Sequence, residues 1–183
     1  MNKIFMYELK RLILNKFFFL LAAVSGLYGY LILSDEIIYG IAYTAPFSPW
    51  SYGIYIAKVL PLLLVTLLFF ITFLYSRQEK QVRLLTSATP VNIPVYCAIK
   101  CAAITAGFVI ISLFVILISV IFYAKVFGFY NFSKFLAPIF ITLIPAFLFI
   151  FGIGLLAGSI QSNILYALRL AALALGFFPL PEF

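Results

Sequence analysis

The stretch CAAITAGFVIISLFVILISVIFY, residues 101–123, contains no charged side chain and is mostly aliphatic or aromatic. A helix needs about 20 consecutive apolar residues to cross the hydrocarbon core of a bilayer, and this stretch is long enough. Further apolar runs lie at residues 17–33, 55–75, 135–160 and 164–178, the last a little short for a full crossing. The pattern predicts an all-α integral membrane protein with about five transmembrane helices, forming one domain over residues 1–183.

The overall composition agrees with this interpretation. Hydrophobic residues make up 66% of the chain and charged residues 9%, with a mean hydropathy of +1.22, whereas a soluble domain is about half apolar and about a quarter charged. The net charge is +7, but the basic residues are spread between the apolar runs, which argues against a nucleic-acid surface. Cys97 and Cys101 match neither a zinc spacing nor a disulfide framework, so we expect no metal site.

The N-terminal segment, residues 1–16, has the pattern of an amphipathic helix. At helical spacing Phe5 and Leu9 fall on one face, and Lys10 and Arg11 fall on the opposite face. We therefore expect an interfacial helix that leads directly into the first span.

The longest polar stretch is residues 76–100, between the second and third spans. Ser76 and Glu79 have the spacing of a capping box, and Thr89 with Pro90 favours an end to the helix. The sequence predicts a short helix here. The alternative is a solvated basic connector that only fixes the topology.

Basic residues also predict the orientation. Segments 1–16 and 76–100 carry four Lys or Arg each, whereas only Lys58, Lys125 and Lys134 lie on the alternate side. Cytoplasmic loops are enriched in Lys and Arg, so the N-terminus is expected in the cytoplasm. On the outer side, Trp50, Tyr52 and Tyr55 are spaced as in an aromatic belt.

The sequence has no catalytic apparatus that we can identify. It lacks a G-x-x-x-x-G-K-[ST] phosphate loop, and the spans lack the His, Asp or Glu that a general base or a metal site would need. We expect that this chain is not an enzyme and binds no cofactor.

Three residues within the spans are candidates for other roles. Gly154 and Gly158 form a G-x-x-x-G pair that would let another helix approach closely, either in the same chain or in a second copy. Arg169 lies inside the last apolar run, where it can snorkel to the head groups or lie at a helix interface.

The segment from Ser76 to Glu79 (SRQE), followed by LLTSATPV at 84–91 and preceded by the basic N-terminal helix, resembles the permease subunits of ABC transporters of the type-2 membrane family. The resemblance extends over the whole chain. In that family the N-terminal helix is an elbow at the membrane surface, and the helix after the second span is the coupling helix that docks on a separate cytoplasmic ATPase.

The resemblance implies a multi-pass subunit of the cell (plasma) membrane, in contact with its lipids, that pairs with a second permease chain, identical or not. Two copies of the ATPase, which carries the ATP and Mg²⁺, would bind it. The implied function is ATP-driven transport, in the exporting direction, with no nucleic-acid partner. The residues expected to dock on the ATPase are Arg77, Gln78, Glu79, Lys80, Val82, Arg83 and Leu85.

Family members usually have six spans, whereas this sequence ends just after the fifth apolar run. We therefore expect the chain to be a fragment that lacks the sixth span, the alternative being a natural five-span variant. An alternative function is a non-transporting membrane scaffold or assembly factor that recruits a cytoplasmic partner through the same loop. The sequence does not indicate the transported substrate.

Overall fold

A computed structural model describes residues 2–40, 44–76, 79 and 92–177. The regular elements in these residues are helices and none is a strand, which confirms the predicted all-α fold. In chain order they are α1 (Asn2–Ile13), α2 (Lys16–Asp35), the 3-10 turn η1 (Ile37–Tyr39), α3 (Pro49–Leu74), α5 (Ile93–Phe127), the 3-10 turn η2 (Phe132–Phe135), α6 (Leu136–Ile160) and α7 (Ile164–Phe177).

Four segments among the described residues are long and apolar enough to cross a membrane: Lys16–Tyr39, Pro49–Leu74, Ile93–Phe127 and Phe132–Ile160. They identify the chain as a membrane protein. The fifth predicted span corresponds to α7, which has 14 residues. At 1.5 Å per residue α7 is about 21 Å long, shorter than the roughly 30 Å hydrocarbon core. The described residues thus provide four candidate spans, where about five were predicted.

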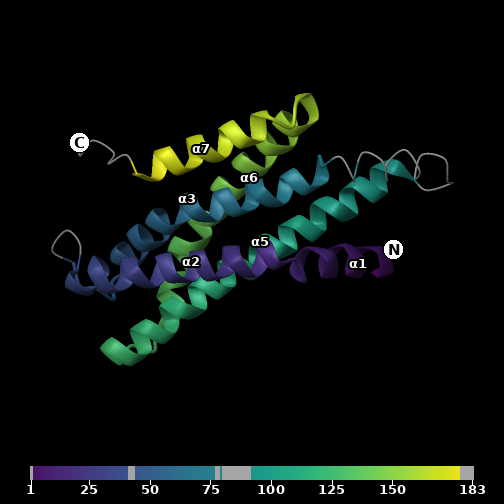
Figure 1. The fold of residues 1–183 in the computed structure, drawn as a ribbon. Helices are drawn as coiled ribbons and strands as arrows, with labels where there is room; N and C mark the ends of the chain where they lie inside the picture. The colour runs from purple at the N-terminus through teal and green to yellow at the C-terminus, as the bar shows by residue number, and fades with distance from the viewer. Residues whose placement is uncertain (1, 41–43, 77–78, 80–91, 178–183) are drawn as a thin grey trace.

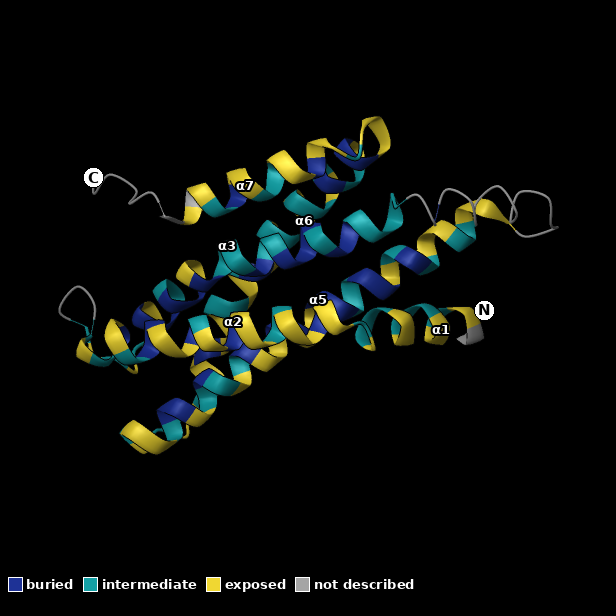
Figure 2. Cartoon of the chain, viewed as in Figure 1, coloured by how far each residue is buried: buried dark blue, intermediate teal, exposed yellow. Residues whose placement is uncertain are grey.

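Helix α3 is the centre of the bundle. It packs against α2, α5, α6 and α7, and in Figure 1 it runs between α2 and α7 while α5 and α6 cross obliquely. In the most apolar stretch of α3, 56% of the residues are buried inside the protein. In the corresponding stretch of the segment that contains α6, only 6% are buried. Figure 2 shows the corresponding difference, with much of α6 and α7 exposed. Since these exposed side chains are apolar, their natural surroundings are lipid.

Two spans begin earlier than the apolar runs predicted. Helix α3 starts at Pro49 rather than at residue 55, because Ser48 caps it: its Oγ accepts a hydrogen bond of 3.1 Å from the backbone N–H of Ser51. Helix α5 starts at Ile93 rather than at residue 101, after Asn92. Proline in the first turn favours both starts, since the N–H that proline lacks has no partner there. The predicted starts missed these first turns, because α5 continues past Lys100 toward its N-terminus and α3 begins with Pro49 and Ser51.

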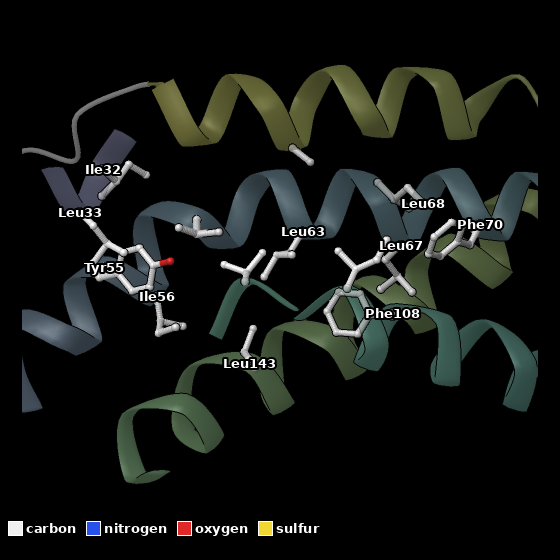
Figure 3. Packing of buried hydrophobic residues seen from close by; sticks show 14 of the residues in the cluster. Ile32, Leu33, Tyr55, Ile56, Leu63, Leu67, Leu68, Phe70, Phe108 and Leu143 are labelled. Carbon is white, nitrogen blue, oxygen red and sulfur yellow. The ribbon is translucent and has the colours of Figure 1, made fainter. Parts of the chain in front are cut away.

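Buried aliphatic and aromatic side chains of α3 form the main core, as Figure 3 shows. Leu63, Leu67 and Phe70 point inward from α3, where they meet side chains such as Phe108 of α5 and Leu143 of α6. Each of these side chains is at least nine-tenths buried. Burying an aliphatic or aromatic side chain away from water stabilises a fold by about 1.5–3 kcal/mol, but lipid replaces water here, so close packing contributes more of the stability.

Tyrosines close the end of the bundle opposite α1. The Tyr52 ring stacks on Phe135 with centroids 4.1 Å apart, and its hydroxyl hydrogen-bonds Ser119 Oγ at 3.0 Å. Tyr55 is also fully buried, whereas Trp50 is 65% exposed. The predicted aromatic belt therefore applies only to Trp50. The two tyrosines face α5 and α2 because α3 turns that side inward.

The glycine pair of α6 lies against α3 of the same chain. A Cβ added at Gly154 would lie 2.7 Å from Ile71 Cδ1, and one added at Gly158 would lie 2.2 Å from the Tyr75 ring. The Tyr75 hydroxyl donates a hydrogen bond of 2.8 Å to the carbonyl of Leu155. The absence of side chains at these two positions lets Ile71 and the Tyr75 ring lie directly on the α6 backbone.

Candidate functional site

Four charged side chains gather where α1, the end of α3 and the first turns of α5 meet. Glu8 and Arg11 lie three residues apart on α1, so both project from one face of that helix. This face packs along α5, which carries Lys100, and Figure 1 shows α1 beside the first half of α5. Glu79 enters from the segment that follows α3.

The four groups form a closed ring of alternating charge, which we call the charge ring. The Glu79 carboxylate accepts a hydrogen bond from Arg11 Nη1 on one oxygen and from Lys100 Nζ on the other. Glu8 closes the ring, with its oxygens 3.8 Å from Arg11 Nη1 and 3.9 Å from Lys100 Nζ. Each acid therefore contacts both bases, and the formal charges cancel.

The side chains of the charge ring differ in their exposure. Glu79 and Lys100 retain 7% and 9% of their side-chain surface, Glu8 retains 14% and Arg11 43%. Lys100 Nζ also lies 4.5 Å from the centre of the Tyr96 ring, a cation–π contact. Removing one partner of a buried pair leaves an uncompensated charge, so the central Glu79–Lys100 pair is the costly one to break.

Helix length explains how a membrane helix tolerates Lys100 at this position. Helix α5 has 35 residues, which corresponds to about 52 Å of helix, against a hydrocarbon core of about 30 Å. Its first turns can therefore extend beyond the hydrocarbon, and the charge ring belongs to that end of the bundle.

The contacts within the charge ring favour the ionised forms of Glu79 and Arg11. Partial burial by itself raises the pKa of Glu79, but hydrogen bonds from Lys100 and Arg11 outweigh it and hold this pKa below its ordinary value. Burial likewise lowers the pKa of Arg11, and the hydrogen bond with Glu79 more than compensates, so the net pKa of Arg11 is raised. Both groups are charged across the physiological pH range.

A cavity of about 290 Å³ adjoins the charge ring. Its polar wall is the ring itself with Ser76 and Asn15, and its apolar wall comes from α1, α3 and α5, including Phe70 and Phe73. The cavity therefore lies between the charge ring and the apolar side chains of the three helices.

The chemistry available at this site is electrostatic. Among the residues that the structure describes, no group of three or more His, Cys, Asp or Glu could hold a metal ion. Both carboxylates of the charge ring are already engaged by cations, so neither is placed to act as a general base. The charge ring can hold α1, α5 and the segment after α3 together, and this link is lost if the ion pairs of Glu79 separate.

The residues expected to dock on an ATPase are only partly described. Arg77, Gln78, Lys80, Val82, Arg83 and Leu85 lie outside the described residues, and their role stays a prediction. Glu79 is described, and its backbone N–H donates a hydrogen bond of 3.3 Å to Ser76 Oγ, which is one half of the predicted capping box. The reciprocal bond is not formed, because the Ser76 N–H donates to the Phe73 carbonyl instead. The Glu79 carboxylate faces the charge ring and not the surface, which suits a positioning role better than a docking one.

Arg169 lies at a helix interface. One guanidinium nitrogen donates a hydrogen bond to Thr72 Oγ1, and the guanidinium carbon is 5.0 Å from the centre of the Phe69 ring. Of the two alternatives that the sequence left open, the structure shows Arg169 lying against α3.

Sequence analysis missed three members of the charge ring. It placed Arg11 on the polar face of the first helix and counted Lys100 only as a topology signal, and it gave Glu8 no role. A signal was present, because the chain has only five carboxylates and two of them lie in the basic segments. The pairing itself joins residues 21 and 68 positions apart, a separation that no local pattern reveals.

No protein-family model matches the chain, and neither a curated protein nor a solved structure does so significantly. The charge ring is the feature most relevant to function, because it connects the segment after α3 with two other helices.

Proposed function

We propose that the chain is a membrane-spanning permease subunit of an ATP-driven ABC exporter, and that it couples to a separate cytoplasmic ATPase through the loop after α3. The observation that carries this proposal is the position of Glu79. Glu79 lies five residues after the end of α3 and contacts both Arg11 of α1 and Lys100 of α5. A partner that displaces the loop would thereby act on two helices at once.

The charge ring suits the transmission of such a displacement. Helix α1 packs along α5, and α5 in turn packs against α2 and α3, so a shift of the ring reaches most of the bundle. Tightly packed helices move as units and not by continuous deformation. ATP binding by the partner would then change the angle of α5, and with it the exposure of a substrate path between the helices.

The charge distribution supports a cytoplasmic location for this end. Segments 1–16 and 76–100 hold eight of the twelve basic residues, and the structure brings α1 and the start of α5 together at one end. By the preference of Lys and Arg for the cytoplasmic side, that end faces the cytoplasm of the cell, where ATP is present. A second permease chain would complete the transporter, and the partner ATPase would bind the ATP and Mg²⁺.

Co-purification tests the proposal. The tagged chain is isolated from its native membrane in mild detergent, and proteins that accompany it are identified by mass spectrometry. We expect a cytoplasmic ATPase with a phosphate loop. Val82→Asp should lose it, because an unpaired carboxylate in a desolvated contact costs several kcal/mol.

Two further variants separate docking from positioning. Val126→Asp makes the same change at an exposed site near the opposite end of α5, and it should recover the ATPase as wild type does. Glu79→Gln should also retain the ATPase, since its carboxylate faces the charge ring. Equal recovery by Val82→Asp and wild type would refute the docking assignment, and capture of a partner without a phosphate loop would favour a membrane scaffold instead.

A further inference from the structure

Arg169 uses little of its hydrogen-bonding capacity inside the protein. Apart from the bond to Thr72, its guanidinium lies between the Phe69 ring at 5.0 Å and the Tyr166 ring at 4.9 Å. Its Nε is buried and has no hydrogen-bond partner among the described residues. Because a guanidinium has five N–H donors, several remain for a ligand.

The charge of Arg169 is also unbalanced within the described part of the chain. Glu8 and Glu79 are engaged in the charge ring, and Glu36 pairs with Lys58. None of the ion pairs among the described residues includes Arg169. Charged side chains within membrane proteins commonly pair with an opposite charge, and an anion from outside these residues could supply one to Arg169.

A second cation lies on the same aromatic strip. Lys16 Nζ is 5.6 Å from the centre of the Phe17 ring, and Phe17 lies 5.7 Å from Phe69, which contacts Arg169. The strip thus crosses α2, α3 and α7 with a cation at each end. Lys16 is exposed and, like Arg169, forms no ion pair among the described residues.

Both cations lie near the end of the bundle that carries the charge ring. Lys16 is the first residue of α2, and Arg169 lies five residues after the start of α7, which is about 7.5 Å along the helix. A side chain at that depth can extend to the lipid head groups, and aromatic rings favour the same level of the membrane.

We propose that Lys16, Phe17, Phe69 and Arg169 form a binding site for the phosphate of an anionic phospholipid. Arg169 would donate two parallel hydrogen bonds to the phosphate, as a guanidinium fork allows. Lys16 would face the rest of the head group. This second cation selects a lipid of net negative charge, because the choline amine of a zwitterionic lipid would be repelled by it. The proposal does not depend on the transport function.

Native mass spectrometry of the purified full chain measures the binding. The protein in detergent is titrated with phosphatidylglycerol or phosphatidylcholine, and the two dissociation constants are compared. Arg169→Gln should weaken phosphatidylglycerol binding about fivefold, which corresponds to the roughly 1 kcal/mol that one basic residue contributes at an anionic membrane surface. Lys16→Gln should have a similar effect. Phosphatidylcholine binding should change little in either variant.

Two controls keep the result interpretable. Lys134→Gln removes an exposed cation near the opposite end of the bundle and should leave both dissociation constants unchanged. Arg169→Lys keeps the charge but not the guanidinium fork, so its phosphatidylglycerol binding should fall between that of wild type and that of Arg169→Gln. If Arg169→Gln does not fold, the Lys16→Gln arm decides.

Two results would overturn the site. One is a preference for phosphatidylglycerol that persists in the folded Arg169→Gln and Lys16→Gln variants. The other is competition by glycerol phosphate at the same concentration as the lipid, which would show that a soluble phosphate and not a phospholipid is bound.

Discussion

Gly158→Ala tests the closest contact in the bundle. The added methyl group would lie 2.2 Å from Cε2 and 2.4 Å from Cδ2 of Tyr75, so the ring and α6 must separate by about 1.2 Å to reach the 3.4 Å of ordinary contact. The ring cannot turn aside without losing its 2.8 Å hydrogen bond to the Leu155 carbonyl. Overpacking of this kind costs about 1–3 kcal/mol and the lost hydrogen bond about 1 kcal/mol. We therefore expect a total destabilisation of about 2–4 kcal/mol.

The assay is unfolding in mixed micelles. Wild type and variants are titrated with SDS in a mild detergent, and far-UV circular dichroism and Trp50 fluorescence follow the loss of structure. Gly152→Ala is the matched control, because the same change on the same helix meets no heavy atom within 4 Å. Any effect of helix propensity is common to both variants and cancels in their difference.

A double-mutant cycle assigns the cost to Tyr75. Tyr75→Phe removes the hydroxyl that holds the ring, so Gly158→Ala should cost about 1 kcal/mol less in that background. If Gly158→Ala and Gly152→Ala unfold within about 0.5 kcal/mol of each other, α6 does not pack on α3 through this face and the reasoning is refuted.

Three further results are expected. Glu79→Gln should destabilise the protein by about 3 kcal/mol in the same titration, because it leaves Lys100 without its main partner, whereas Asp35→Asn at an exposed carboxylate should have little effect. The stabilisation from Glu79 is fully present above its ordinary pKa of 4.5, and it should be lost as the pH falls through the lowered pKa of the folded state. The free energy of unfolding should therefore depend less on pH in Glu79→Gln than in wild type. An unchanged pH profile would contradict the charge ring. In intact cells, a cysteine at Ser48 in a cysteine-free background should react with a membrane-impermeant reagent while one at Thr86 is protected, and the reverse pattern would invert the proposed topology.

The sequence by itself determined that this is a helical membrane protein, and where most of the chain crosses. Hydropathy is a property of consecutive residues, and a bilayer requires each span to satisfy its own backbone hydrogen bonds, so the runs at 17–33, 101–123 and 135–160 could be assigned without knowledge of their neighbours. The Ser76 cap was equally local, because the bond from the Glu79 N–H spans three residues. Even the errors at the starts of α3 and α5 were confined to a few turns.

Only the tertiary structure decided which side of each helix faces protein. Nearly every residue of a span is apolar, so its lipid-facing and protein-facing sides read alike in the sequence. The sequence could not show that Tyr52 is buried against Phe135, or that Gly158 lies under Tyr75. The charges depended on folding most of all: Glu79 meets Arg11 and Lys100 only because α1 returns along α5, and that contact depends on the packing of whole helices and not on any residue near Glu79 in the chain.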